Sequence, residues 1–233
     1  MRSLTLLFLF FSLHSVASQP VVWGTDSWNN FTNVNGTGFY HELINHIYDK
    51  AHYDVSVEYL SFARSLRSLH EGSIDLTGAL PKSDDFYQSA RPILSEHIYM
   101  VVNGENPPFC CDTTNKVGAY RSGYKEEVFY AALPYEARGV EVASAEDGLK
   151  LLSAGKVDYV VDVQSMLLPL LANPNYGSMS MHSVGYYDLY WSFARTEKGR
   201  ELKTQFDVKL EQLRESGELS TLYKKYQLTM PHE

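Results

Sequence analysis

The stretch 66–76, Leu-Arg-Ser-Leu-His-Glu-Gly-Ser-Ile-Asp-Leu, returns at 149–159 as Leu-Lys-Leu-Leu-Ser-Ala-Gly-Lys-Val-Asp-Tyr. In each copy two leucines three residues apart lie on one helix face, and Gly72 or Gly155 follows where a left-handed C-terminal cap is expected. An apolar strand comes next, at 73–80 in the first copy and 157–163 in the second. The sequence therefore predicts two similar α/β lobes, each with its own sheet, and a cleft between them.

Strands and helices alternate along the rest of the chain, which is typical of mainly parallel sheets with helices on both faces. Besides the two strands of the repeat, we predict strands at 21–24, 55–59, 97–102, 116–120, 140–143, 179–184 and 186–195. The loop 103–108 is rich in Asn, Gly and Pro and is the expected crossing between lobes. We predict a first lobe from 19–102 with 186–233 and a second lobe from 103–185.

The N-terminus indicates export. Arg2 precedes an apolar run at 4–16 that is too short to span a bilayer, and the small residues Ala17 and Ser18 follow it. We therefore predict a signal peptide at 1–18, cleaved to leave a periplasmic protein without direct membrane insertion. No cysteine lies near the cleavage site, which argues against a lipid anchor there.

Composition narrows the class of partner. A formal net charge of −8 argues against nucleic acid and anionic membranes, which favour basic surfaces. The 17 tyrosines suit the wall of a binding cleft, although tyrosines also pack at sheet edges. Cys110 and Cys111 are adjacent and could form a strained vicinal disulfide, pair between molecules or stay reduced. We assign them no catalytic or metal-binding role.

Several short motifs then follow one another in a set order. They are Gly24-Thr25-Asp26, Gly38-Phe39, the repeated Leu-x-x-Gly-x-x-Asp, Val117-Gly118-Ala119-Tyr120, Leu213-Arg214-Glu215-Ser216-Gly217-Glu218-Leu219 and Tyr223-Lys224-Lys225-Tyr226. In this order the chain resembles the bacterial extracellular solute-binding proteins, family 3, the two-lobed receptors of polar amino-acid ABC importers. The resemblance covers nearly all of the chain after the predicted leader. It implies a type II periplasmic-binding-protein fold in which the C-terminal segment completes the first lobe.

The resemblance also implies a set of residues that bind the solute in the cleft. The family grips an amino acid's carboxylate with an arginine after the third strand, but the segment 80–87 contains no arginine and offers only Lys82. Asp162 falls within a residue of the carboxylate that grips an α-ammonium group in the family. The other implied candidates are Asp26, Trp28, Phe62, Arg121 and Tyr124. Each also has a structural reading, as a cap, a packed aromatic or a solvated side chain.

The leading interpretation is a binding protein that captures a small polar solute for an ABC permease, with no cofactor, metal or catalytic residue. One alternative is a sensory or accessory domain that signals through a membrane sensor. Another is an enzyme on the same fold, similar to cyclohexadienyl dehydratase, with Asp162, Glu42 or His41 as acid or base. His41 and His46 lie five residues apart rather than the four that would align two metal ligands, so we expect both histidines at the surface.

Overall fold

The computed structural model describes residues 18–104, 112–133 and 136–231. The predicted leader, except for its last residue, and both Cys110 and Cys111 lie outside the described residues. Within the described ranges, no helix has the length and apolar character needed to cross a membrane.

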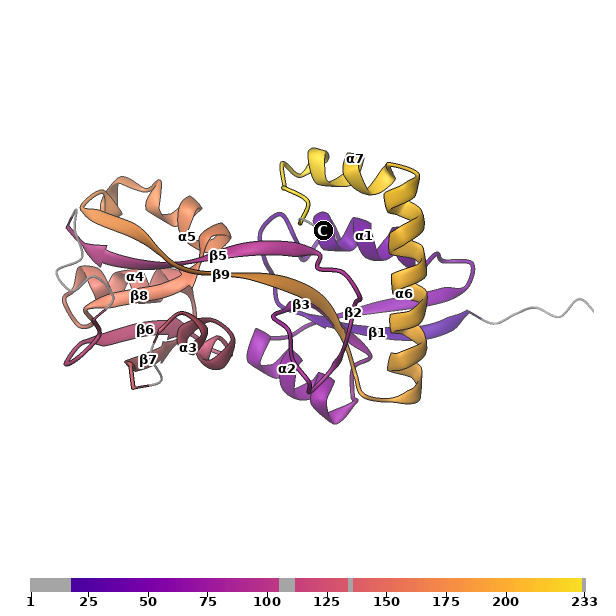
Figure 1. The fold of residues 1–233 in the computed structure, drawn as a ribbon, viewed down its shortest axis with the longest axis horizontal. Coiled ribbons are helices and arrows are strands. Elements are labelled where there is room, and N and C mark those ends of the chain that lie inside the picture. The colour runs from indigo at the N-terminus through magenta and orange to yellow at the C-terminus, as the bar shows by residue number, and fades with distance from the viewer. Residues whose placement is uncertain (1–17, 105–111, 134–135, 232–233) are drawn as a thin grey trace, which may run out of the picture.

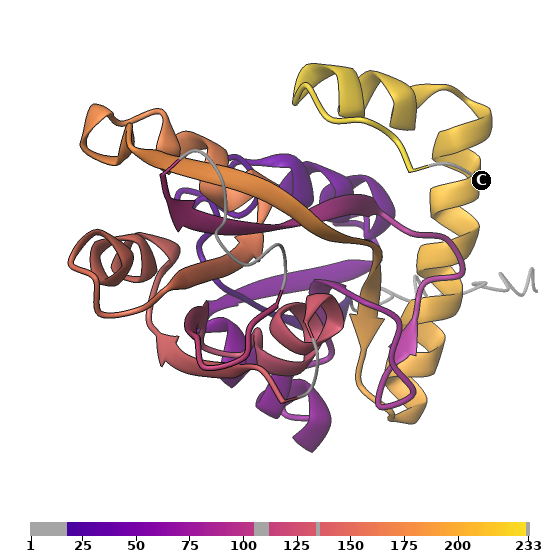
Figure 2. The same ribbon diagram turned by 60° about the vertical axis from the view of Figure 1, so that its left-hand side comes forward.

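The first body is built from both ends of the chain. Its N-terminal elements are β1 (Gln19–Thr25), α1 (Phe39–Ile47), β2 (Tyr53–Tyr59), α2 (Phe62–Glu71), β3 (Leu76–Leu80) and β4 (Tyr87–Gln88). Strand β1 pairs in parallel with both β2 and β3. The C-terminal helices α6 (Glu197–Glu215) and α7 (Glu218–Lys225) return to this body, because Phe206 and Tyr223 share a buried cluster with Trp23 and Phe39. Figure 2 shows α6 and α7, in yellow, along its outer side.

The second body repeats this plan with the middle of the chain. Its elements are β6 (Val117–Arg121), η1 (Lys125–Phe129), α3 (Tyr130–Ala132), β7 (Arg138–Val142), α4 (Ala145–Ser153), β8 (Tyr159–Val163), α5 (Gln164–Leu171) and η2 (Pro174–Tyr176). Strand β6 pairs in parallel with β7 and β8. Phe129 and Tyr159 stack in one of its two buried clusters.

The two copies of the repeat form the same local unit, as predicted. Gly72 follows α2 with φ 72° and Gly155 follows α4 with φ 63°, both in the left-handed region. The aspartates also have matching partners: Asp75 accepts from the backbone N–H of Val22 at 2.7 Å, and Asp158 from that of Val117 at 2.8 Å. Each carboxylate therefore ties the start of one strand to its parallel neighbour, which is a structural role.

Two long antiparallel strands, β5 (Leu94–Asn103) and β9 (Met179–Phe193), run from one body into the other (Figure 1). The strand order is β2-β1-β3-β9-β5-β8-β6-β7, with β4 also paired to β9, so the expectation of two separate sheets is wrong. The strands predicted at 179–184 and 186–195 are one strand, because Gly185 pairs with Ile98 and continues the ladder. Parallel pairing is confined to the outer strands of each body.

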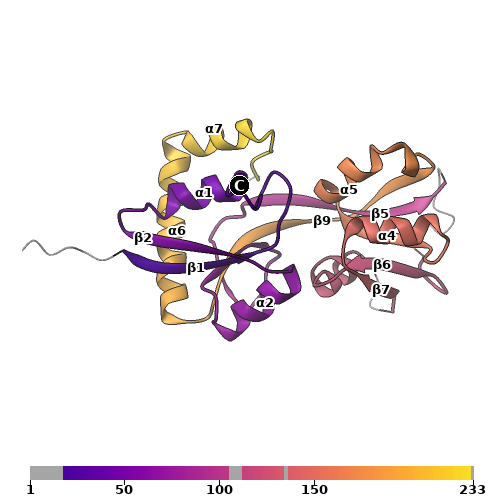
Figure 3. The same ribbon diagram turned by 180° about the vertical axis from the view of Figure 1, so that it is seen from behind.

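The α/β architecture in two bodies is as predicted (Figures 1 and 3). Leu94 belongs to the buried cluster of the first body and Ile98 to a cluster of the second, so the chain passes between them within β5. The predicted lobe boundary at Val102 stays a prediction, and these clusters favour an earlier crossing.

Candidate functional site

A cleft of about 560 Å³ lies between the two bodies. The first body contributes the loop that leads to α1, together with Tyr226 and Leu228. The second body contributes Arg121 at the end of β6, the start of α4 and part of α5. We call this space the outer cleft; its walls are Asp26, Ser27, Trp28, Asn29, Asn30, Phe31, Arg121, Ala143, Ser144, Ala145, Glu146, Ser165, Met166, Pro169, Leu170, Tyr226 and Leu228.

A smaller space of about 50 Å³, which we call the inner pocket, shares Trp28, Phe31, Ser165 and Met166 with the outer cleft. Most of its walls are apolar or aromatic. The other lining residues are Tyr40, Phe62, Ala79, Pro81, Leu94, Glu96, Tyr124, Val128, Val163, Tyr187 and Leu189. The two spaces are therefore neighbours that share a wall.

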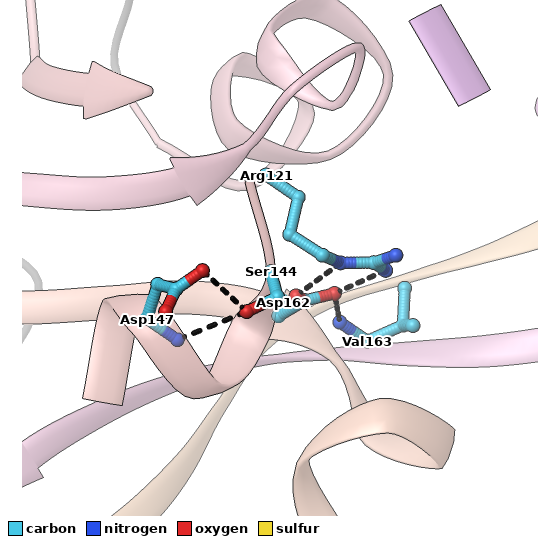
Figure 4. Close-up of polar contacts among 5 residues, drawn as sticks. All are labelled: Arg121, Ser144, Asp147, Asp162 and Val163. Carbon is cyan, nitrogen blue, oxygen red and sulfur yellow. Dashed lines mark hydrogen bonds and ion pairs between the residues drawn. The ribbon is translucent and has the colours of Figure 1, made fainter. Parts of the chain in front are cut away.

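Arg121 and Asp162 form a buried, bidentate ion pair (Figure 4). The Nε of Arg121 donates to Oδ2 of Asp162 at 2.6 Å, and its Nη2 donates to Oδ1 at 2.7 Å. The side chains are 10% and 1% exposed. Burial alone would lower the pKa of Arg121, but the opposed charge of Asp162 raises that pKa above its ordinary value. The guanidinium therefore stays charged.

The sequence explains this pairing locally. Arg121 ends β6 and Asp162 lies near the end of the parallel neighbour β8, so both side chains meet at the same edge of the sheet. The backbone N–H of Val163 also donates to Oδ1 of Asp162 at 2.7 Å. Beside them Ser144 caps α4, accepting from the N–H of Asp147 at 3.1 Å and donating to its carboxylate (Figure 4).

Tyr124 connects this pair to the first body. The guanidinium carbon of Arg121 lies 3.8 Å from the centroid of the Tyr124 ring, and the ring of Phe62 lies 4.7 Å from the same ring. Trp28 packs against Phe62 with centroids 5.7 Å apart. Burial raises the pKa of Tyr124 to about 12, so its hydroxyl stays protonated at neutral pH. An aromatic row thus joins the two bodies beside the inner pocket.

The remaining predicted residues have different surroundings. Asp26 accepts from the N–H groups of Ser27 at 2.7 Å and Phe62 at 3.0 Å, which ties the cleft loop to the start of α2. Lys82 lies over the ring of Tyr190 at 4.3 Å and lines neither space. Asp162 also lines neither space, whereas its ion-pair partner Arg121 lines the outer cleft. Whether any of these residues binds a solute stays a prediction.

Sequence reasoning missed Glu96, which is the one charged side chain that the described part of the chain contributes to the inner pocket. It is partly buried, and Ser165 donates to it through both its hydroxyl and its backbone N–H. Burial, the largest cause, raises the pKa of Glu96 above its ordinary value despite these bonds. The strand predicted from His97 began one residue too late to include it. An earlier start would have put Glu96 where the chain crosses between the bodies.

The residues considered for catalysis lie outside the cleft walls. His41 is buried, so the expectation of a surface position is wrong for it; its Nε2 lies 2.9 Å from the hydroxyl of Tyr59, and burial lowers the pKa of His41. Glu42 accepts from Lys225 and from Tyr226. The described residues include no group of three His, Cys, Asp or Glu side chains placed to hold a metal ion.

Comparison with known proteins gives one family. The sequence profile described as bacterial extracellular solute-binding proteins, family 3, matches residues 22–229. No curated protein sequence matches the chain.

Solved structures share the fold at low identity. The substrate-binding protein of an amino acid ABC transporter is 18% identical, with 89% of this chain and 98% of that chain covered and a TM-score of 0.72. The GluR0 ligand-binding core from Nostoc punctiforme, in complex with L-glutamate, is 20% identical, with 89% and 99% covered and a TM-score of 0.70. A histidine kinase sensor domain similar to periplasmic binding proteins is 19% identical, with 92% and 99% covered and a TM-score of 0.75.

Proposed function

Because this chain belongs to the bacterial extracellular solute-binding proteins, family 3, we propose that it is a periplasmic protein that captures a small solute between its two bodies and performs no covalent chemistry. The observation that carries the proposal is the outer cleft of about 560 Å³, whose walls come from both bodies. A solute held there contacts both bodies at once, so it favours the closed arrangement over an open one.

We propose further that the solute is not a standard α-amino acid. Such a ligand presents an ammonium group and a carboxylate at one carbon. Both oxygens of Asp162 already accept from Arg121, and one of them also accepts from Val163. The segment 80–87 has no arginine, and Lys82 lies over the ring of Tyr190. Neither end of the ligand therefore meets the partner that it needs.

Titration with the twenty standard amino acids tests this proposal. We expect no submicromolar dissociation constant in calorimetry and no comparable stabilisation in thermal-shift measurements. A ligand carboxylate that is buried without a paired charge loses roughly several kcal/mol of binding free energy. A loss of ~1.4 kcal/mol already weakens the affinity tenfold. Submicromolar binding of any one amino acid contradicts the proposal. The Lys82→Met variant then reports whether Lys82 holds the carboxylate of that ligand.

Delivery of the solute to an ABC permease is the first candidate role, and it is supported by the transporter protein among the structural neighbours. A sensory role is the second, and it is supported by the histidine kinase sensor domain, which has the same fold. Crosslinking of the exported protein in intact cells distinguishes them. Capture of a permease subunit favours transport, whereas capture of a membrane kinase or cyclase favours sensing.

A further inference from the structure

The charges around the cleft do not balance. Among the described lining residues, the outer cleft has Asp26, Arg121 and Glu146, and the inner pocket has Glu96. The positive charge of Arg121 is matched by Asp162 at 2.6 Å, and Glu146 is matched by Lys150 at 3.0 Å. Within the described ranges, no Lys or Arg forms an ion pair with Asp26 or Glu96: Asp26 accepts from two backbone N–H groups, and the charge of Arg121 acts on Glu96 from a distance, opposed by that of Asp162. The site is therefore electronegative.

Glu96 sits in an unusual wall for a carboxylate. Aromatic side chains line the same pocket: Trp28, Phe31, Tyr40, Phe62, Tyr124 and Tyr187. Burial raises the pKa of Tyr40 and of Tyr187 well above the ordinary value, so both phenols stay neutral. A charged carboxylate in such surroundings gains most from a cation that it can contact directly.

The aromatic rings suit a cation as well. The face of a Trp, Tyr or Phe ring attracts ammonium and guanidinium groups, most strongly where water is excluded. Tyr124 already has one such contact, with the guanidinium of Arg121 at 3.8 Å. An organic ammonium group is recognised by aromatic rings and a carboxylate placed around a small space, as they are in the inner pocket. An anion there would be repelled by Glu96.

We propose that the inner pocket binds the ammonium group of a small organic cation that lacks an α-carboxylate, with Glu96 as its counter-ion and the surrounding aromatic rings as its walls. This inference rests on the proposed function and names its solute class. The inner pocket takes the charged end of the solute. The remainder extends into the outer cleft past Trp28 and Ser165, which line both spaces.

Glu96 has a competing structural role, because it accepts from the backbone N–H of Ser165 in the first turn of α5. A purely structural Glu96 predicts that its exchange for glutamine changes stability and leaves solute affinity alone. A counter-ion predicts a loss of affinity in a folded protein. The Glu96→Gln variant separates the two roles, because glutamine keeps the shape of the side chain and can still accept from Ser165.

The test is calorimetric titration with methylammonium, tetramethylammonium, choline and putrescine, with a second readout from intrinsic tryptophan fluorescence, to which Trp28 contributes together with Trp23 and Trp191. The uncharged isostere of choline, 3,3-dimethylbutan-1-ol, is the ligand control. We expect at least one cation to bind and the neutral isostere to bind at least tenfold more weakly than choline. Glu96→Gln should weaken cation binding at least tenfold with an unchanged circular dichroism spectrum, and Glu141→Gln, at an exposed position of β7, should leave it unchanged.

Three results overturn the inference: equal binding of choline and its isostere, unchanged affinity in Glu96→Gln, or no binding of any of the four cations. A parallel thermal-shift panel of neutral sugars and dicarboxylates separates this failure from that of the proposed function. Binding of one of those solutes overturns the cation inference and leaves the proposed function standing. A protein that binds nothing in either panel contradicts both.

Discussion

At the scale of single residues, the pairing of Arg121 with Asp162 determines what the cleft can offer a ligand. Two charges that leave water each lose hydration, and only close, bidentate contact together with further hydrogen bonds compensates for that loss. Here the guanidinium makes two bonds to the carboxylate, and Val163 supplies a third donor. The pair is internally satisfied, so the carboxylate has little left to offer an ammonium group from outside.

We expect the loss of one partner of this ion pair to destabilise the protein strongly, and the replacement of both partners to destabilise it less than the two single losses together. Asp162→Asn or Arg121→Met alone should lower the free energy of unfolding by about 3–5 kcal/mol, because each leaves a buried charge without its partner. The double variant Arg121→Met/Asp162→Leu should cost less than the sum of the single variants. Urea denaturation measures all of these changes.

Lys150→Met is the matched control for this prediction, since it breaks the exposed ion pair with Glu146 and should cost about 0–1 kcal/mol. A cost below about 1 kcal/mol for Asp162→Asn would mean that water reaches the carboxylate, contrary to its burial.

At the scale of elements, the cleft loop and α1 depend on each other. Helix α1 has no side-chain cap; instead the N–H of Phe39 donates to the carbonyl of Asn30 at 2.8 Å, and that of Tyr40 to the carbonyl of Phe31 at 3.1 Å. Gly38 permits this close approach, because its φ is 121° and a Cβ there would lie 2.4 Å from the Phe31 oxygen. The start of the helix thus positions the loop that contributes Trp28 and Phe31 to the cleft.

Gly38→Ala should therefore damage both the helix start and the cleft. We expect a loss of about 1–3 kcal/mol in the free energy of unfolding from the Gly-only backbone conformation, and about 1–3 kcal/mol more from the clash. The tryptophan fluorescence of the protein, to which Trp28 in this loop contributes, should shift as the loop moves.

Gly36→Ala serves as the control, because Gly36 also has a positive φ, 78°, but open space around it. It should cost only about 1–2 kcal/mol, from the left-handed conformation alone. Equal losses in the two variants would show that the close approach at Gly38 contributes nothing.

At the scale of the whole molecule, two continuous strands connect the two bodies, and side chains of both bodies meet beside the cleft. Strands β5 and β9 pass from one body into the other (Figure 1), and we propose that the bodies rotate about these strands when a solute binds. On the cleft side, Tyr124 meets Phe62, and Gly123 lies against the backbone of Ala63, where a Cβ would be 3.0 Å from the nitrogen. The absence of a side chain at Gly123 thus allows the bodies to approach closely.

A side chain at Gly123 should hold the bodies apart. Asparagine tolerates the left-handed conformation that Gly123 adopts at φ 83°, so Gly123→Asn adds volume with little backbone strain. We expect a larger radius of gyration in X-ray solution scattering and weaker solute binding. Gly155→Asn, at φ 63° and with no neighbour within 4 Å, should leave the radius of gyration unchanged. An equal effect of the two substitutions would place the close approach elsewhere.

The sequence by itself determined the repeated helix–glycine–strand unit and the α/β architecture in two bodies. These features follow from periodicity and from the conformational freedom of glycine, both of which act between near neighbours in the chain. The same local information could not join two predicted strands into β9 across Gly185, because pairing with β5 decides where that strand ends.

Only the tertiary structure decided which partners the candidate residues have. The bond between Arg121 and Asp162 spans 41 residues of sequence and depends on the register of β6 against β8. His41 is buried because α1 lies over Trp23 and beside Tyr59, and Glu96 joins the inner pocket because β5 crosses between the bodies there. Partner, burial and charge balance are properties of side chains brought together from distant positions, so no local pattern encodes them.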